Sequence, residues 1–223
     1  MVVGSDAAYD DVAEAYSRVF DPEGVELGDP VLEGLLGDVR DQRVLSLACG
    51  QGRDARLLAS LGAVVTGLDV SEAMLESARA RERARPLGIG YVQDDAQEPG
   101  LPDASFDGVV CHMALMDIPS LPRTIASVGR VLRAKGWFVF SIVHPCFHPH
   151  VELVGEYLVD ARYLKQVPLD ALPGHAYHRP LADYVNELDA AGLQIRRMVE
   201  VRHGAEPEGH GVPGLMYVRA TKR

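Results

Sequence analysis

Short apolar runs alternate with amphipathic segments through the middle of this chain. Uninterrupted apolar runs are typical of buried strands, whereas apolar residues that recur once per helical turn are typical of helices. This alternation predicts an α/β fold, in which a parallel sheet is covered by helices on both faces. The expected strands lie at residues 43–47, 63–68, 90–93, 106–111 and 136–143, and the expected helices between them at 53–61, 71–85 and 121–132.

The pattern changes before and after this region. Apolar positions predict helices at residues 6–20 and 30–36, which would form an N-terminal helical cap over residues 1–40. From residue 144 to residue 179 the alternation stops, and four prolines interrupt the apolar stretches. We interpret residues 144–179 as an insertion that forms a lid and binds substrate, with a hairpin near residues 151–163.

Regular structure is expected again at the C-terminal end. A helix at residues 181–191 precedes two strands at 193–201 and 215–221. A closing hairpin of this kind adds an antiparallel strand to a parallel sheet. The sequence therefore predicts one domain over residues 1–223, with a mostly parallel sheet of seven strands and an antiparallel C-terminal strand.

The first expected strand runs into a glycine-rich turn in the segment VLSLACGQGRDA. Gly50 and Gly52 permit a tight turn and a close approach of the backbone to a ligand, and the following helix offers N–H groups to an anion. The turn alone leaves the ligand open, because Gly50, Gly52 and Ala55 also satisfy the G-x-G-x-x-A pattern of dinucleotide-binding proteins. An NAD(P)-dependent oxidoreductase is therefore one alternative.

Two carboxylates follow the next strands along the chain. Asp69 ends the second strand in VVTGLDVS, where a carboxylate can accept hydrogen bonds from ribose hydroxyls. Asp95, in QDDAQ after the third strand, can accept one from an adenine amino group, with the Ala96 N–H facing a ring nitrogen. Because the carboxyl ends of parallel strands share the ligand-binding edge of a sheet, we expect the glycine turn, Asp69 and Asp95 to lie together.

Taken as a set, these segments resemble the class I S-adenosylmethionine-dependent methyltransferases. The resemblance runs from about residue 43 to residue 143 and rests on VLSLACGQGR, VVTGLDVSEAMLESAR, YVQDDAQEPGLPDASFDGVVC and VGRVLRAKGWFVFSIVHPCF. It is strongest toward the bacterial small-molecule branch related to quinone-biosynthesis methyltransferases, which HRPLADYVNELDAAGL also resembles. The resemblance implies a Rossmann-like, doubly wound sheet and an enzyme that transfers a methyl group from S-adenosylmethionine to an O, N or C nucleophile of a small molecule.

The resemblance also implies roles for single residues. Ser46 stands where the family usually has an acidic residue, which removes one contact to the amine of the cofactor. Ala48, Gly50 and Gly52 would line the methionine end, and Asp69 would hold the ribose. The other implied cofactor contacts are Val70, Met74, Asp95 and Ala96 at the adenine, Cys111, His112 and Met113 near the sulfonium, and Tyr9 and Tyr16 on the covering N-terminal helix.

Three histidines are candidate general bases. Methyl transfer requires an aligned nucleophile and, for some acceptors, removal of a proton, which an imidazole can perform near neutral pH. His144 follows the fifth strand, His112 follows the fourth, and His178 lies with Arg179 at the end of the insertion. Each also has a structural interpretation, in which His144 positions its loop, His112 packs against the cofactor, and His178 and Arg179 pin the insertion to the last helix.

Composition narrows the partners. A formal net charge of −10 disfavours a nucleic-acid substrate, and no apolar run is long enough to span a membrane. Sparse cysteines without a secretory signal predict the reducing cytoplasm. The His and Cys residues at 144–150 fit no standard zinc spacing, so no metal is expected. A cofactor-binding protein with a regulatory or non-methylating role is a further alternative, because a fold does not determine its chemistry.

Overall fold

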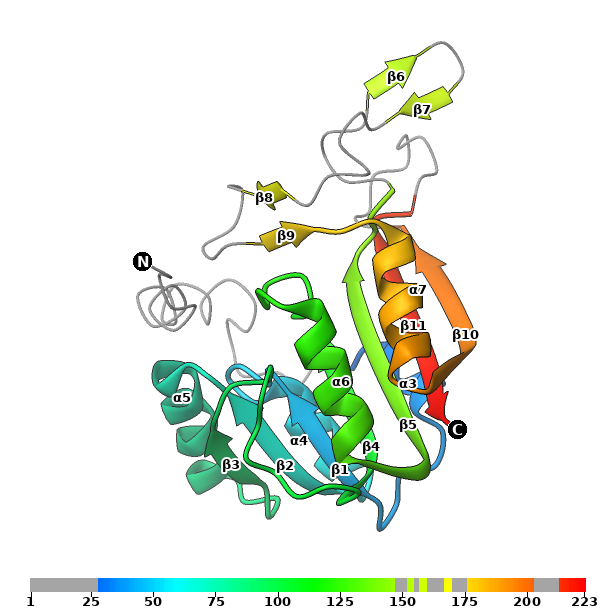
Figure 1. The fold of residues 1–223 in the computed structure, drawn as a ribbon. Coiled ribbons are helices and arrows are strands. Elements are labelled where there is room, and N and C mark those ends of the chain that lie inside the picture. The colour runs from blue at the N-terminus through cyan, green and yellow to red at the C-terminus, as the bar shows by residue number, and fades with distance from the viewer. Residues whose placement is uncertain (1–27, 147–151, 155–156, 160–166, 170–175, 203–212) are drawn as a thin grey trace, which may run out of the picture.

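A seven-stranded sheet forms the centre of the molecule (Figure 1). The computed structural model describes residues 28–146, 152–154, 157–159, 167–169, 176–202 and 213–223. In the order β10-β11-β5-β4-β1-β2-β3, the strands are β10 (Leu193–Val201), β11 (Leu215–Lys222), β5 (Leu132–Val143), β4 (Phe106–His112), β1 (Arg43–Leu47), β2 (Val64–Asp69) and β3 (Gly90–Gln93).

The strand directions confirm the fold class predicted from the sequence. β3, β2, β1, β4 and β5 are parallel neighbours. β11 is antiparallel to both of its neighbours, β5 and β10. The sheet is therefore Rossmann-like and mostly parallel, with an antiparallel strand near the C-terminus. β5 begins at Leu132 rather than at residue 136, because Leu132 already pairs with Phe106 before a register shift.

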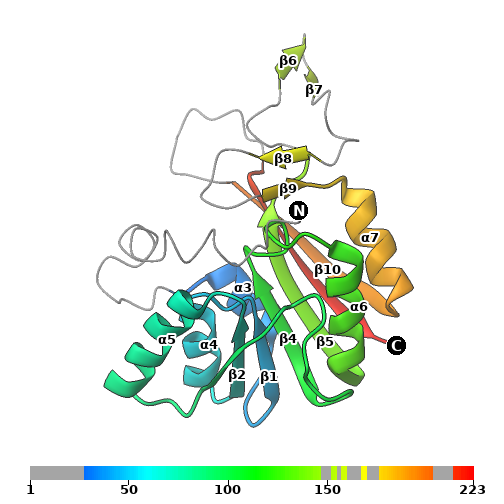
Figure 2. The ribbon, with the colours of Figure 1, turned by 60° about the vertical axis from the view of Figure 1, so that its left-hand side comes forward.

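Helices cover both faces of the sheet, as the alternation predicted (Figures 1 and 2). One face carries α3 (Pro30–Leu36), α4 (Arg53–Ser60) and α5 (Glu72–Ala84), and the other carries α6 (Leu121–Val131) and α7 (Leu181–Ala190). Three of these helices begin at a residue whose side chain accepts from free N–H groups: Asp29 caps α3, Ser71 caps α5 and Ser120 caps α6.

The two faces bury separate hydrophobic clusters, because side chains alternate along each strand. Leu45, Val109 and Cys111 pack with α6 and α7, whereas Val44 and Val110 pack with α3 and α4. By the same alternation Ser46 and His112, at the carboxyl ends of β1 and β4, belong to the face of α3 and α4. The sheet thus brings polar residues to one corner, next to the glycine turn.

The insertion contributes two small hairpins. The hairpin expected near residues 151–163 is present as β6 (Glu152–Val154) and β7 (Tyr157–Val159). A second hairpin, of β8 (Val167–Leu169) and β9 (Ala176–His178), was not predicted. In Figures 1 and 2, β8 and β9 lie beyond the carboxyl end of β5, and β9 leads into α7. The expected N-terminal helix with Tyr9 and Tyr16 lies outside the described residues.

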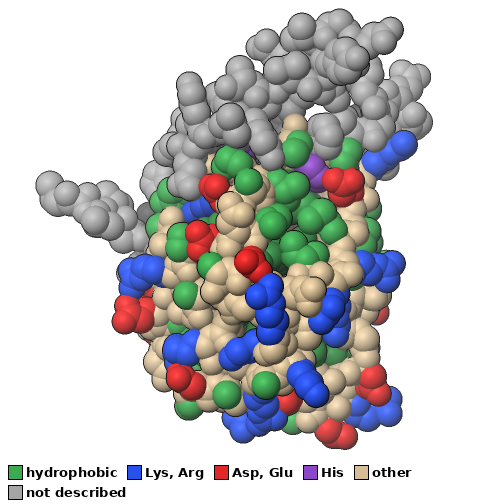
Figure 3. Space-filling model, turned by 45° about the vertical axis from the view of Figure 1, so that its right-hand side comes forward, with side chains coloured by type: hydrophobic (Ala, Val, Ile, Leu, Met, Phe, Trp, Pro, Cys, Tyr) green, Lys and Arg blue, Asp and Glu red, His purple; other side chains and the backbone are tan. Residues whose placement is uncertain are grey.

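The described surface is uneven in character. In Figure 3, hydrophobic side chains gather in the upper part of the molecule, near the carboxyl edge of the sheet, and Lys and Arg side chains spread over the lower part. Among the described helices, none combines the length and the apolar character that a membrane crossing requires. On the face that Figure 3 shows, apolar side chains therefore lie mainly toward the carboxyl edge of the sheet.

Candidate active site

The glycine turn adopts left-handed backbone at three alternate residues. Ala48 and Gly50 both have φ of 51°, and Gly52 has φ of 84°. A Cβ added to Gly50 would meet no atom of the described residues within 4 Å, whereas a Cβ on Gly52 would lie 2.4 Å from the Tyr91 hydroxyl oxygen. Gly50 therefore faces open space, and Gly52 leaves room for the aromatic ring that packs beneath the turn.

Asp69 ties the second strand to this turn. Its Oδ2 accepts a hydrogen bond from the Gly50 N–H at 2.6 Å, and its Oδ1 accepts one from the Ser71 N–H at 3.0 Å. The side chain lies in a nearly buried position, with 9% of the residue exposed. Charge-assisted bonds of this kind are stronger than neutral ones, so the carboxylate is held in place. The expected proximity of the glycine turn and Asp69 is present.

Asp95 lies on the neighbouring loop, which the Asp94 N–H fixes to the Asp69 carbonyl at 3.0 Å. Its carboxylate accepts from Gln97: Oδ1 from the backbone N–H at 2.8 Å and from Nε2 at 3.1 Å, and Oδ2 from Nε2 at 3.0 Å. Gln97 is not among the residues that the sequence predicted at the site. The carboxylate predicted to read the adenine edge is therefore oriented by one amide.

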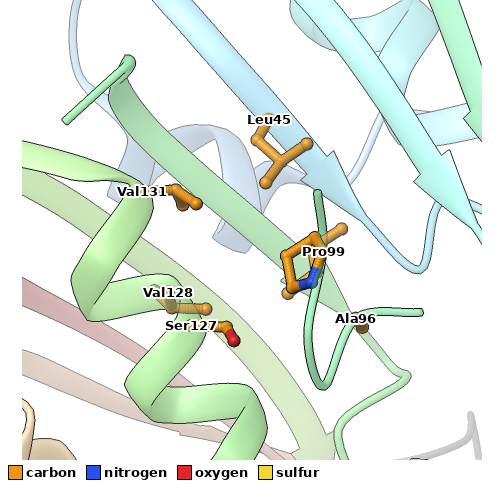
Figure 4. Close-up of a pocket in the computed structure, with 7 residues that line it drawn as sticks. Leu45, Ala96, Pro99, Ser127, Val128 and Val131 are labelled. Carbon is orange, nitrogen blue, oxygen red and sulfur yellow. The ribbon is translucent and has the colours of Figure 1, made fainter. Parts of the chain in front are cut away.

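The side chain of Ala96 points the other way, into an apolar crevice under α6 (Figure 4). Leu45 and Leu47 of β1, Pro99, and Ser127, Val128 and Val131 of α6 complete its lining. The crevice has no room for a water molecule. It is part of the core and leaves only the backbone of Ala96 for contact with a ligand.

His112 lies between two carboxylates at the carboxyl end of β4. Its Nε2 is 3.6 Å from Asp29 Oδ2, and its Nδ1 is 3.5 Å from Asp54 Oδ1. Tyr217 of β11 donates its hydroxyl hydrogen to Asp29 Oδ2 at 2.7 Å, and its ring meets the imidazole edge-on. Within the described part of the chain, the buried Nδ1 atom has no hydrogen-bond partner. We name His112, Asp29, Asp54 and Tyr217 the His112 cluster.

Burial decides the protonation of the nearby acidic groups. It raises the pKa of Tyr217, and the hydrogen bond and charge of Asp29 raise it further, so the phenol stays protonated at neutral pH. Burial also raises the pKa of Cys111, whose thiol is fully enclosed in the cluster under α6 and α7. The Cys111 side chain therefore lies on the opposite face from His112, and its expected contact with the cofactor stays a prediction.

Val70 and Met74 follow Asp69 at the start of α5. Met74 is buried, with its N–H bonded to Ser71 Oγ at 3.2 Å, and Val70 is half-buried. The Val70 carbonyl accepts from Gln93 Nε2 at 3.1 Å. The half-exposed Val70 is the better placed of the two for contact with a ligand.

His144 is built into the protein by both ring nitrogens. Nδ1 accepts from the Cys146 N–H at 3.1 Å, which leaves the proton on Nε2, 2.8 Å from Glu200 Oε1. The side chain is 2% exposed. These contacts match the structural interpretation of His144, in which it fixes the loop after β5.

Arg179 reaches from the end of β9 to the loop that follows β4. Its Nη1 donates to the Leu115 carbonyl at 2.9 Å, and its Nη2 donates to the carbonyls of Ile118 at 2.5 Å and Pro119 at 3.0 Å. The Tyr177 N–H adds a bond to the Met116 carbonyl at 2.6 Å. Arg179 and His178 are both buried. Arg179 thus anchors the end of the insertion to the β4–α6 loop, rather than only to the last helix.

Comparison with known proteins identifies the family. The methyltransferase-domain family model matches residues 45–140. A solved S-adenosylmethionine-dependent methyltransferase from Mesorhizobium loti superposes with a TM-score of 0.75, at 30% identity over 86% of this chain and 96% of that one. This chain belongs to the class I S-adenosylmethionine-dependent methyltransferases. The resemblance inferred from its motifs is confirmed, and the oxidoreductase alternative is not favoured by these relatives.

Several curated relatives of this methyltransferase are named for small molecules. The ubiquinone biosynthesis O-methyltransferase of Saccharophagus degradans is 28% identical over 72% of this chain and 66% of its own length. The nocamycin O-methyltransferase of Saccharothrix syringae is 33% identical over 56% of this chain and 47% of its own length. The chain therefore spans about two thirds or less of these two relatives.

The geometry of this methyltransferase fits the cofactor of its family. Open space lies where Gly50 lacks a side chain, so a ligand can approach the turn closely. At the same edge of the sheet, the buried Nδ1 of His112 has no hydrogen-bond partner among the described residues. His112 was expected from the sequence, but its neighbours Asp29, Asp54 and Tyr217 were missed, as was Gln97. Asp29 before Pro30 does carry the signal of a helix cap.

Proposed function

We propose that this methyltransferase transfers a methyl group from S-adenosylmethionine to a nucleophile of a small molecule, releasing S-adenosylhomocysteine. One observation carries the proposal. Asp69 Oδ2 bonds the Gly50 N–H at 2.6 Å, and this joins the ribose-binding candidate to the open glycine turn. When bound, the cofactor supplies a methyl group on an electrophilic sulfonium.

The residues at the carboxyl edge divide the work of binding. Ala48 and Gly50 line the methionine end, Asp69 accepts from the ribose, and Asp95 accepts from the adenine amino group. Asp54 lies in the first turn of α4, two residues after Gly52, and together with Asp29 it brings negative charge to this edge. That charge suits the cofactor's ammonium group where Ser46 replaces the usual acid.

The acceptor is a small molecule with an O, N or C nucleophile. Two of the relatives are named as O-methyltransferases, which favours a hydroxyl among these three nucleophiles. Where a proton must leave, His112 is the favoured base, because its Nδ1 has no partner in the described structure, while His144 uses both ring nitrogens. The net charge of −10 disfavours a nucleic-acid acceptor, and the sparse cysteines favour the cytoplasm.

Calorimetry with two ligands tests the proposal. We expect S-adenosylhomocysteine to bind and NADH not to bind. Asp69→Asn keeps the shape of the side chain but removes its charge, and it should weaken S-adenosylhomocysteine about 100-fold. Asp189→Asn, at an exposed carboxylate of α7, is the matched control and should bind normally.

Two results would contradict the proposal. Binding of NADH, or of neither ligand, would remove the cofactor assignment. Normal affinity in Asp69→Asn would show that the ribose is held elsewhere. Methyl transfer to a panel of phenols, amines and activated carbons then tests the reaction, and binding without transfer to any acceptor favours the non-methylating alternative.

A further inference from the structure

The amide of Gln97 connects two parts of the molecule that the proposed function treats separately. Its Nε2 bonds both carboxylate oxygens of Asp95, at 3.1 Å and 3.0 Å. Its Oε1 accepts from the Ser120 N–H at 3.0 Å, at the N-terminus of α6. One side chain therefore joins the adenine-side carboxylate to the end of the β4–α6 loop.

The two carboxylate oxygens of Asp95 differ in the number of hydrogen bonds that they accept. A carboxylate oxygen can accept about two hydrogen bonds. Asp95 Oδ1 already accepts two, from the backbone N–H and Nε2 of Gln97, while Oδ2 accepts one. Among the described residues, Oδ2 therefore keeps one acceptor position. Gln97 thus fills Oδ1 and leaves Oδ2 as the carboxylate oxygen that can accept a further hydrogen bond.

The backbone of Gln97 is anchored independently of its side chain. Ser127 Oγ donates to the Gln97 carbonyl at 2.9 Å. The Ser120 end is fixed as well, because the carbonyls of residues 115, 118 and 119 in the preceding loop bond Arg179. The amide is thus held between two rigid supports, as a residue that orients another must be.

We propose that Gln97 is a positioning residue that sets the purine specificity of the cofactor site by aiming Asp95 Oδ2 at the exocyclic amino group. This inference rests on the proposed contact between Asp95 and adenine. A purine that carries a carbonyl in place of the amino group would set an acceptor against the fixed carboxylate. A site built to accept a hydrogen bond rejects such an analogue strongly.

The test compares two ligands in the wild-type protein and four variants. S-adenosylhomocysteine and S-inosylhomocysteine differ at the purine amino group, and calorimetry gives the ratio of their affinities. Gln97→Met keeps the length but removes every side-chain hydrogen bond, and Gln97→Glu keeps an acceptor for Ser120 but removes the donor to Asp95. Asp95→Asn is the reference for loss of the carboxylate, and Gln194→Met, on the exposed face of β10, is the matched control.

We expect the wild-type protein and Gln194→Met to favour the adenosyl ligand by at least about 100-fold. In both Gln97 variants this ratio should fall about tenfold, because the carboxylate loses its fixed direction. Thermal unfolding of each variant checks that the fold is retained.

An unchanged ratio in the Gln97 variants overturns the inference, even if both affinities fall together, because general loosening weakens the two ligands equally. If Asp95→Asn also leaves the ratio unchanged, the adenine contact of the proposed function is wrong. If the wild-type protein binds neither ligand, the cofactor assignment itself fails.

Discussion

The two halves of the sheet's carboxyl edge use polar side chains in opposite ways. Around β1, β2 and β4, Gly50 faces open space and His112 Nδ1 has no partner among the described residues. Around β5 and β9, both ring nitrogens of His144 form hydrogen bonds within the protein. The guanidinium of Arg179 donates hydrogen bonds to three backbone carbonyls. The position of a polar residue at the end of a strand therefore does not show by itself that the residue takes part in function.

This difference separates what substitutions should do in each half. On the side of the glycine turn, changes should weaken ligand binding and leave the free energy of unfolding nearly unchanged. On the side of the insertion, changes should lower that free energy and leave ligand binding nearly unchanged.

The largest effect on stability is expected for Arg179→Met. The variant leaves three carbonyls without their donor, two at buried bonds and one at a part-buried bond, which should lower the free energy of unfolding by about 3 kcal/mol. Denaturant titration measures this loss, and calorimetry should show that affinity for S-adenosylhomocysteine changes by less than about threefold. A large loss of affinity in a stable protein would erase the division between the two halves.

A pair of alanine variants compares the two histidines directly. His144→Ala should lower the free energy of unfolding by about 2 kcal/mol, because it breaks two hydrogen bonds of a buried side chain. Cofactor affinity should stay unchanged. His112→Ala should reduce turnover of a hydroxyl acceptor about tenfold or more while the unfolding midpoint stays close to wild type. If His144→Ala instead folds normally and loses turnover, His144 is the base and the comparison is reversed.

The smallest effect concerns Tyr184 of α7, beside Arg179. Burial raises the pKa of this phenol from 10.0 to about 12, against a smaller opposite effect of Arg179. Because the unfolded phenol ionises first, its contribution to stability is complete below pH 10 and is lost as the pH rises toward 12. Between pH 9 and 11 the wild-type protein should lose about 1 kcal/mol relative to Tyr184→Phe. Parallel urea titrations at both pH values measure it, and curves that keep a constant separation would contradict the assignment.

The sequence was sufficient for elements whose signals are local. Each central strand is an apolar run, and Gly50, Gly52 and Asp69 belong to motifs that the chain carries within a few residues. The β8–β9 hairpin was missed because Pro168 interrupts the apolar run of β8, and a proline within a run argues against a strand. The early start of β5 depends on pairing with Phe106, a contact that the sequence of β5 does not contain.

The parts of the site that could not be predicted depend on distant partners. Asp29 and Tyr217 bond across 188 positions, and only the folded sheet brings them to His112. Arg179 bonds backbone carbonyls, which every residue has, so its acceptors leave no mark in the sequence. Gln97 could not be predicted because its amide also bonds the Ser120 N–H, 23 positions along the chain, and only the fold brings the two together.

The two glycines of the turn offer different opportunities for redesign. A methyl group at position 52 would collide with Tyr91, but one at position 50 would touch no described protein atom and would enter the space that we propose for the cofactor. Ala48 already holds the same left-handed φ as Gly50, so this turn tolerates an alanine in that conformation. Alanine or a larger side chain at position 50 could therefore exclude the natural cofactor by steric clash. A smaller cofactor analogue that lacks the clashing atoms would still bind.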